Sequence, residues 1–327
     1  MLYSKAVSAI ILTLLAVVPL ALFYGGHPFW LDVATRLVIL AIAASSLNFI
    51  LGYGGLVSFG HAAYLGLGAY AVGIPVYHSI FGGVDFLGLA TANGWVHLVI
   101  GLVVCALFAL LTGAVSLRTK GVYFIMITMA FSQMLYYALI SIKTYGGDDG
   151  LTIMTRSQLP GISLDDPVQL YALCFGSLLV VMALVRMLVN SRFGQVLQGA
   201  RGNPQRVQIL GFNIFYYQLL AYVLAGVIAG YAGFLLANFT AYISPEMMDW
   251  TRSGELMFMV ILGGVAVMLG PVLGAAAFIL IEELFSHFTI YWQLPFGLML
   301  MLVVLFSKGG LAKWLRLQTG VSGQGRP

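Results

Sequence analysis

The sequence contains 327 residues, of which 61% are hydrophobic and only 8% are charged. Soluble globular domains carry about 25% charged residues, so this chain has too few charges to cover a water-facing surface. Its formal net charge of +4 does not indicate nucleic-acid binding, because membrane proteins concentrate Lys and Arg in their cytoplasmic loops.

Apolar runs of about 20 residues recur along the chain, and each is long enough to cross a bilayer as a helix. A transmembrane barrel would instead show alternating segments of about 10 residues, which the sequence lacks. We therefore expect an all-α polytopic membrane protein with about ten transmembrane helices. The expected spans are residues 6–24, 31–51, 61–80, 95–117, 121–142, 168–189, 214–239, 253–269, 271–287 and 289–306.

Three local features refine these spans. No cleavage pattern follows the first span, so we expect it to remain as an uncleaved helix. Cys105 and Cys174 fall inside apolar runs and are expected to be buried thiols, not a disulfide. Spans eight and nine meet at Gly270-Pro271, where a re-entrant pair is the alternative to two full crossings.

The distribution of charge predicts the topology. With the N-terminus inside, the cytoplasmic segments hold 11 of the 15 basic residues and none of the 11 acids. The positive-inside rule then places both termini in the cytoplasm. The 11 basic residues are Lys5, Arg118, Lys120, Arg186, Arg192, Arg201, Arg206, Lys308, Lys313, Arg316 and Arg326.

Ten spans divide into two sets of five, and a half with an odd number of spans inserts upside down relative to its partner, as in many transporters. Residues 54–60 after span two and 263–270 at the end of span eight share glycines, so an inverted 5+5 repeat is one expectation. The longest loop is too short for a soluble core. We expect one transmembrane domain over residues 1–317 and a disordered polar tail over 318–327.

A polar insert at residues 190–213 separates spans six and seven and contains three arginines and no acid. Asn203 and Pro204 favour the start of a short helix, and Gly211 favours its end. Two helical turns are not stable alone, so the insert must pack on the membrane domain, on lipid headgroups or on another subunit. The apolar residues of this helix are Val207, Ile209 and Leu210.

Polar residues cluster at a glycine-rich break between spans two and three and along span five. Broken helices with polar side chains are typical of transporter sites, and helix packing is the alternative explanation. Thr128 and Ser132 are four residues apart, so they share one helix face. The expected helix-break residues are Gly52, Gly54, Gly55 and Gly60, and the expected translocation path is lined by Asn48, Ser58, His61, Thr128 and Ser132.

The sequence lacks the patterns of several other functions. There is no P-loop, so the chain is not expected to bind ATP itself. No nucleophile–base pair and no metal-ligand spacing stand out, so we expect no enzyme activity, no metal and no cofactor. Ion-coupled carriers usually keep ionisable residues at midspan, whereas Arg36, Glu255 and Glu282 are expected near outer ends. An ion-coupled secondary transporter and a passive channel remain the alternatives.

In combination, several stretches resemble the permease family of branched-chain amino acid ABC transporters, in particular its LivM-like subunit. The stretches are residues 47–70, 119–131, 146–151, 191–211, 243–246 and 263–275. The family's cytoplasmic segment usually contains acids where this chain has Gly202, Gln205 and Gln208.

The resemblance implies a multi-pass permease of the bacterial inner membrane that imports branched-chain amino acids, urea, short amides or aromatic acids by alternating access. It also implies a homologous second permease subunit, two cytoplasmic ATPase subunits that bind the ATP, and a periplasmic substrate-binding protein. The insert would then dock on an ATPase. The implied coupling residues are Arg201, Gly202, Asn203, Pro204, Arg206, Val207, Leu210 and Gly211.

Overall fold

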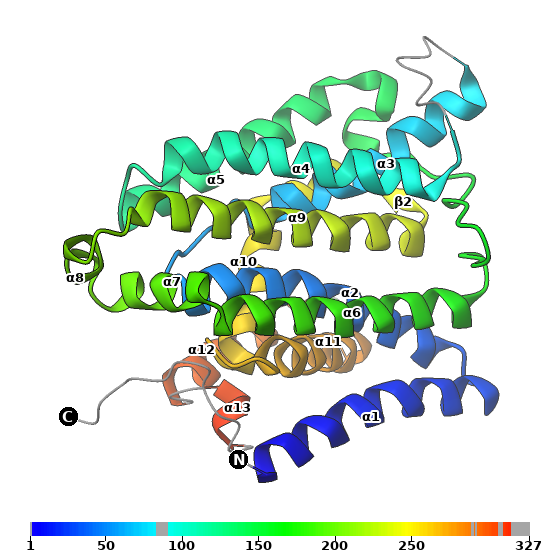
Figure 1. Cartoon of the computed structure of the whole chain (residues 1–327). Coiled ribbons are helices and arrows are strands. Elements are labelled where there is room, and N and C mark those ends of the chain that lie inside the picture. Colours follow the sequence, from blue (N-terminus) through cyan, green and yellow to red (C-terminus); the bar gives the residue numbers. More distant parts are fainter. Residues whose placement is uncertain (1, 83–90, 289–290, 292, 307–309, 315–327) are drawn as a thin grey trace.

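The computed structural model describes residues 2–82, 91–288, 291, 293–306 and 310–314, and these residues form an almost entirely helical bundle (Figure 1). The first half of the chain contributes α1 (Leu2–Tyr24), α2 (Phe29–Asn48), the π-helical turn η1 (Phe49–Tyr53), α3 (His61–Phe81), α4 (Gly94–Ser116) and α5 (Val122–Ser141). Short 3-10 turns η2 (Lys143–Tyr145) and η3 (Gly147–Asp149) and strand β1 (Leu151–Thr152) follow.

The second half begins with α6 (Pro167–Asn190) and the two short helices α7 (Arg192–Gly202) and α8 (Pro204–Ile209). It continues with α9 (Ile214–Thr240), strand β2 (Tyr242–Ile243), the 3-10 turn η4 (Pro245–Met248), α10 (Trp250–Gly263), α11 (Gly270–Phe288), α12 (Gln293–Phe306) and α13 (Gly310–Trp314). The strands β1 and β2 pair antiparallel, with Leu151 opposite Ile243.

Six of the described helices are long and apolar enough to cross a membrane, and they confirm the expected polytopic all-α architecture. The six are Ala6–Tyr24, Phe29–Tyr53, Gly94–Ser116, Val122–Ser141, Pro167–Asn190 and Ile214–Thr240. The segment Phe29–Tyr53 is mostly buried because α2 packs against α1, α6, α9, α10 and α11. The bundle is therefore built around α2 and α9, with α1 and α5 at its periphery.

The two ends of the bundle are distinct (Figure 1). The α7–α8 pair, the start of α1 and α13 lie at one end, which we call the elbow end. The paired strands β1 and β2 lie at the opposite end, which we call the sheet end. Basic residues of the predicted cytoplasmic set, such as Arg192, Arg201 and Arg206, therefore share the elbow end, while Asp148 and Asp149 precede β1 at the sheet end.

One expectation needs correction at the junction of spans eight and nine. The helix expected over 253–269 ends at Gly263, because Gly264 and Ala266 have φ values of 118° and 62°, which an α-helix does not allow. The resulting α10 has 14 residues and is about 21 Å long, shorter than the hydrocarbon core of about 30 Å. The length of α10 therefore favours the re-entrant alternative over a full crossing, and the number of crossings stays a prediction. The tail expected over 318–327 and the basic residues Lys308, Arg316 and Arg326 lie outside the described residues.

Helices α3 and α9 approach closely through glycines of both helices. A Cβ on Gly233 would overlap the carbonyl oxygen of Leu65, and one on Gly68 would overlap that of Gly230. Small residues let helix backbones pack at this range in membranes. The crossing of α3 and α9 therefore has no room for even a methyl group.

We expect Gly233→Ala to destabilise the protein by about 1–3 kcal/mol, because the added methyl group forces the two helices apart. Gly176→Ala is the matched control, since Gly176 lies in a helix of similar length with nothing within 4 Å of an added Cβ. Thermal unfolding of both variants in the same detergent checks the prediction. Equal melting temperatures would show that the α3–α9 crossing can relax at no cost.

Candidate functional site

The first connector, residues 54–60, turns back into the bundle before α3 begins. His61 Nε2 lies 2.7 Å from Ser46 Oγ, so the start of α3 is level with Ser46 in α2. The chain continues from Ser46 to Tyr53 before it turns, which is about 10 Å further toward the elbow end at 1.5 Å per helical residue. The glycine-rich break expected between spans two and three is therefore present, and α3 begins inside the bundle.

The second connector, residues 241–249, enters the bundle from the sheet end. Ser132 Oγ donates to the Met248 carbonyl at 2.6 Å, and Gln133 Nε2 donates to Asp249 Oδ1 at 2.5 Å. Ser132 and Gln133 occupy the middle of the 20-residue α5. Helix α10 therefore begins at about half the depth of the bundle and runs toward the elbow end.

The N-termini of α3 and α10 meet at this depth. Ser253 Oγ accepts a hydrogen bond of 2.9 Å from the Ala62 N–H, which is one of the first four amides of α3 that have no partner within the helix. Helix α3 runs from this point to the sheet end, where Gly73 lies against Ile243 and Leu151. Helices α3 and α10 thus begin at one level inside the bundle and run in opposite directions.

The polar face expected on α5 joins both connectors. Thr128 Oγ1 accepts from the Phe59 N–H at 3.3 Å, one turn from the bond between Ser132 and Met248. Thr128 and Ser132 share one helix face, as their spacing predicts, and both are buried. In this conformation their hydroxyls hold backbone groups of the connectors, which is the interhelical bonding that the sequence left open as an alternative.

Asn48, the last residue of α2, holds the turn between α10 and α11. Its Nδ2 donates to the Val267 carbonyl and its Oδ1 accepts from the Ala266 N–H, each at 3.0 Å. A Cβ on Gly52 would lie 2.7 Å from Ala266 N, so only glycine fits beside this turn. The Asn48 amide thus satisfies two backbone groups of a turn that contains a residue at positive φ.

The five expected path residues are all buried, and each makes at least one hydrogen bond. Ser46 Oγ donates its hydrogen to the Ala43 carbonyl, so the bond between Ser46 and His61 is donated by His61 Nε2. His61 Nδ1 is then a buried acceptor with no partner in the described part of the chain. The Ser58 hydroxyl accepts from the Gly60 N–H at 3.3 Å within the connector. Whether these residues line a translocation path stays a prediction.

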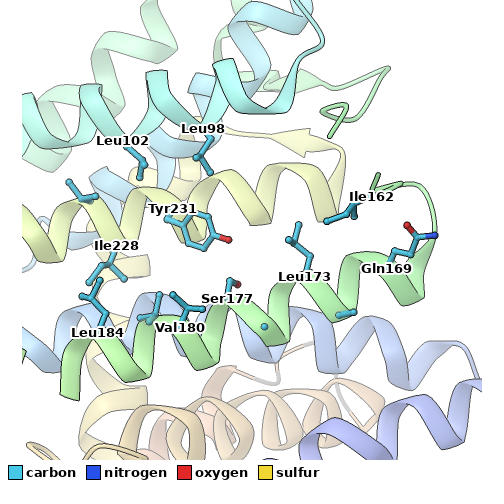
Figure 2. A pocket seen from close by; sticks show the side chains of 14 residues that line it. Leu98, Leu102, Ile162, Gln169, Leu173, Ser177, Val180, Leu184, Ile228 and Tyr231 are labelled. Atoms are coloured by element: carbon cyan, nitrogen blue, oxygen red, sulfur yellow. The ribbon is translucent and has the colours of Figure 1, made fainter. Parts of the chain in front are cut away.

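A cleft of about 810 Å³ lies elsewhere, on the flank where α6 faces α4 and α9 (Figure 2). Its walls are almost entirely apolar and include Leu98, Leu173, Val180 and Ile228, with Ser177 and Tyr231 as polar members. None of the five expected path residues lines it. A cleft of this chemistry suits hydrocarbon and offers little to orient a polar solute.

The α7–α8 pair, which we call the elbow, has the cap residues that the sequence predicts. Ser191 caps α7, and the Asn203 side chain accepts from the Arg206 N–H at the start of α8. Pro204 is the first residue of α8. Gly211, two residues after the end of α8, has a φ of 87°. Arg201 donates a hydrogen bond to the Gly52 carbonyl, which joins the elbow to η1, the turn that follows α2.

The apolar residues of α8 do not share one environment. Val207 is buried with Ala200 and Ile214, so it holds the elbow on the membrane domain. Ile209 and Leu210 are 86% and 69% exposed. The apolar residues of α8 therefore fall into a buried part, Val207, and an exposed part, Ile209 and Leu210. The exposed part has no partner among the described residues.

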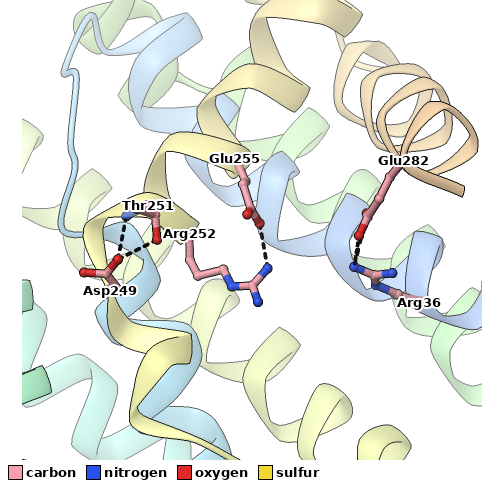
Figure 3. Close-up of polar contacts among 6 residues, drawn as sticks. All are labelled: Arg36, Asp249, Thr251, Arg252, Glu255 and Glu282. Atoms are coloured by element: carbon pink, nitrogen blue, oxygen red, sulfur yellow. Dashed lines mark hydrogen bonds and ion pairs between the residues drawn. The ribbon is translucent and has the colours of Figure 1, made fainter. Parts of the chain in front are cut away.

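Two ion pairs connect charged side chains of α2, α10 and α11 (Figure 3). Arg36 Nη2 contacts Glu282 Oε1 at 3.0 Å, and Arg252 Nη1 contacts Glu255 Oε2 at 2.9 Å. Because α10 starts at mid-depth, Arg252 and Glu255 are not at an outer end. Sequence reasoning missed this because it treated residues 253–269 as a full crossing. Among the described residues, no group of His, Cys, Asp and Glu could hold a metal ion.

Comparison with known proteins identifies the family. A model of the family described as "Branched-chain amino acid transport system / permease component" matches residues 29–306. The chain belongs to this permease family. The match covers α2 to α12, and therefore both connectors and the elbow. With its apolar helices, membership makes the chain a multi-pass membrane protein and the permease component of a transport system with partner subunits.

Three relatives of this permease are similar along most of their length. The "High-affinity branched-chain amino acid transport system permease protein LivM" of Salmonella typhimurium is 24% identical over 320 residues, which are 90% of this chain and 73% of the relative. The protein of the same name in Escherichia coli is 24% identical over 88% of this chain and 71% of the relative. The "Probable branched-chain amino acid transport permease protein LivM" of Methanocaldococcus jannaschii is 25% identical, with 83% and 89% covered. No solved structure gives a significant match.

We expect Asn48→Leu in this permease to loosen the turn at residues 264–269, because the buried Ala266 N–H loses its partner and the Val267 carbonyl keeps only the Gly270 N–H. An unpaired buried group costs about 1–3 kcal/mol. Hydrogen–deuterium exchange of peptides covering 263–270 should become at least tenfold faster. Ser45→Ala is the control, since the buried Ser45 hydroxyl has no partner in the described residues. Unchanged exchange in Asn48→Leu would mean that the turn does not depend on this amide.

Proposed function

We propose that this chain is a transmembrane permease subunit of an ATP-binding-cassette importer for branched-chain amino acids or related small solutes. The elbow carries this proposal: a capped pair of helices at one end of the bundle exposes Ile209 and Leu210 while Val207 fixes it to the membrane domain. In this function the ATP is bound by separate subunits. The chain itself performs no covalent chemistry.

The exposed side of α8 would dock into a groove on a cytoplasmic ATPase subunit. A short helix with two exposed apolar side chains suits binding in a groove, since burial of each such side chain contributes about 1.5–3 kcal/mol. Arg206 is exposed beside them and would contact acidic groups of the partner. The absence of acids at Gly202, Gln205 and Gln208 removes ion pairs that the resemblance would imply, but it leaves this apolar contact in place.

ATP-driven closure of two ATPases would move the elbow and switch the path between outward and inward access. The bond from Arg201 to Gly52 supports this route, because it connects the elbow to η1 beside Asn48 and the 264–269 turn. A second, homologous permease subunit would cover the exposed face of α5, and a periplasmic binding protein would deliver substrate at the sheet end. The elbow end would then be cytoplasmic and the membrane the bacterial inner membrane.

An ion-coupled secondary transporter is the second candidate, because the structure places Arg252 and Glu255 at mid-depth, where carriers of this kind keep ionisable residues. It would need no ATPase, and its uptake would collapse with an ionophore. The names of the relatives favour permease components of larger transport systems. Urea, short amides and aromatic acids are the other substrates that the importer proposal includes.

We expect the double variant Ile209→Asp, Leu210→Asp to lose at least tenfold in ATPase retention during copurification from detergent, because both exposed anchors become charged. The control is Gln205→Asp, which adds a charge at an exposed position of α8 without removing apolar surface. It should keep the ATPase bound. Normal retention in the double variant would remove the elbow as the docking site, and ATPase-independent uptake would favour the secondary transporter.

Labelling of introduced thiols tests the proposed orientation. Cys105 and Cys174 are free and buried, as expected, so native thiols should give little background. We expect a membrane-impermeant maleimide to label Asp148→Cys in intact cells and Gln208→Cys only after lysis. The reverse pattern would place the elbow outside the cell and contradict the proposed coupling to ATPases.

A further inference from the structure

Four charged side chains lie together within the depth of the bundle, on α2, α10 and α11 (Figure 3). Arg252 and Glu255 follow the start of α10, which is level with the middle of α5 through the bond between Gln133 and Asp249. Glu282 is three residues from the centre of α11, or about 4.5 Å along its axis. Its partner Arg36 is five residues from the centre of the 29–53 span, or about 7.5 Å.

These charges are not sealed between helices. The side chains of Arg252 and Glu255 are 43% and 34% exposed, and Arg36 and Glu282 are also partly exposed. Charged groups at this depth are costly against lipid and almost always face a bundle interior or a water-filled cavity. The face that carries the four side chains must therefore border water or another subunit, and not the hydrocarbon.

Stability alone does not explain the pair on α10. Arg252 and Glu255 are three residues apart in one helix, so their bond joins no separate elements. Pairs of this spacing contribute about 0.2–0.5 kcal/mol to a helix, which is far less than the cost of placing charges inside a membrane protein. The helix gains too little from this pair to explain why two charges are kept at an accessible position. A role in binding explains them better.

The two ion pairs are close enough to interact, because the carboxylates of Glu255, Glu246 and Glu282 all favour the charged Arg252 guanidinium, against the effect of its burial. Two guanidinium groups and two carboxylates give a neutral set with donors and acceptors of both signs. That set complements a zwitterion, because a guanidinium binds a carboxylate with two parallel hydrogen bonds and a carboxylate accepts from an ammonium.

An apolar side chain lies next to the charged set. Phe258 is three residues beyond Glu255, which places it on the same face of α10, and it is exposed. An aliphatic side chain of a bound amino acid would find a hydrophobic surface there. An uncharged amide or urea would leave both ion pairs intact and gain little from them.

We propose that Arg252, Glu255, Arg36 and Glu282 form a binding site for the charged groups of a zwitterionic α-amino acid in the translocation path. The substrate carboxylate contacts Arg252 and its ammonium contacts Glu255, with the Arg36–Glu282 pair as the adjoining set. The inference rests on the proposed transport function and names the substrate class within it: zwitterions in preference to uncharged solutes.

Equilibrium binding of radiolabelled leucine to the purified permease–ATPase complex, without binding protein, tests the proposal. We expect saturable binding in the millimolar range, displaced by leucine but at least tenfold less well by 4-methylpentanamide, which has the same carbon skeleton without the two charges. Arg252→Gln and Glu255→Gln should each weaken leucine binding about ten- to hundredfold, as expected when a charge-assisted hydrogen bond is lost.

The double variant Arg252→Gln, Glu255→Gln separates a binding role from a structural one. Binding should stay lost in the double variant, whereas a merely structural pair would be repaired when both charges are absent. Arg156→Gln is the control, because it removes a charge from the ion pair between Arg156 and Asp165 in the loop before α6. It should leave leucine binding unchanged, and all variants should retain the ATPase and the wild-type melting temperature within a few degrees.

The proposal would be overturned by the absence of saturable leucine binding to the wild-type complex, or by wild-type binding in both single variants. Equal displacement by leucine and the uncharged amide would also overturn it. In each case, ATPase retention and ATP-driven uptake of any solute would leave the importer function standing. Loss of ATPase association in the wild type would instead count against the importer function itself.

Discussion

The structure depends on how two non-helical connectors keep their backbone groups paired inside an apolar bundle. An unpaired N–H or C=O costs several kcal/mol in hydrocarbon, so irregular backbone is tolerated only where protein groups or water satisfy it. Here the partners are short polar side chains: Thr128 for Phe59, Ser132 for Met248, and Ser253 for Ala62. These few hydroxyls allow α3 and α10 to begin inside the bundle. The depth of every residue along these two helices is set by where the helices begin.

The same constraint connects the elbow to the centre of the molecule. Val207 packs on Ala200, and Arg201, the next residue, bonds to the Gly52 carbonyl in η1, the turn that follows α2. One turn earlier, at the end of α2, Asn48 holds the 264–269 turn. A displacement of the elbow therefore acts first on backbone that is irregular and held by side chains, and not on the middle of a regular helix.

The sequence predicted the features that depend on local composition. Apolar runs located the helices to within a few residues, and Asn203, Pro204 and Gly211 located the ends of α8. It could not predict partners that are distant along the chain, such as Asn48 and Ala266, 218 residues apart. It also could not show where the helix expected over 253–269 ends, because apolar composition continues through Val265 and Val267 although the helix has ended at Gly263. For the same reason the sequence placed Glu255 near an outer end, whereas α10 begins level with the middle of α5.

The inverted 5+5 repeat stays a prediction, but the structure changes which segments it would relate. The glycine pattern aligned residues 54–60 with 263–270, whereas a 5+5 repeat relates span three to span eight, and so relates the connector 54–60 to 241–249. Both connectors enter the bundle before a helix, and the two helices run in opposite directions from one level. Their chemistry differs, since 54–60 contains no ionisable residue and 241–249 brings Glu246 and Asp249, followed by Arg252 and Glu255. A repeat built on one backbone plan would thus carry three of the four proposed binding charges in its second half, with Arg36 of α2 as the contribution of the first half.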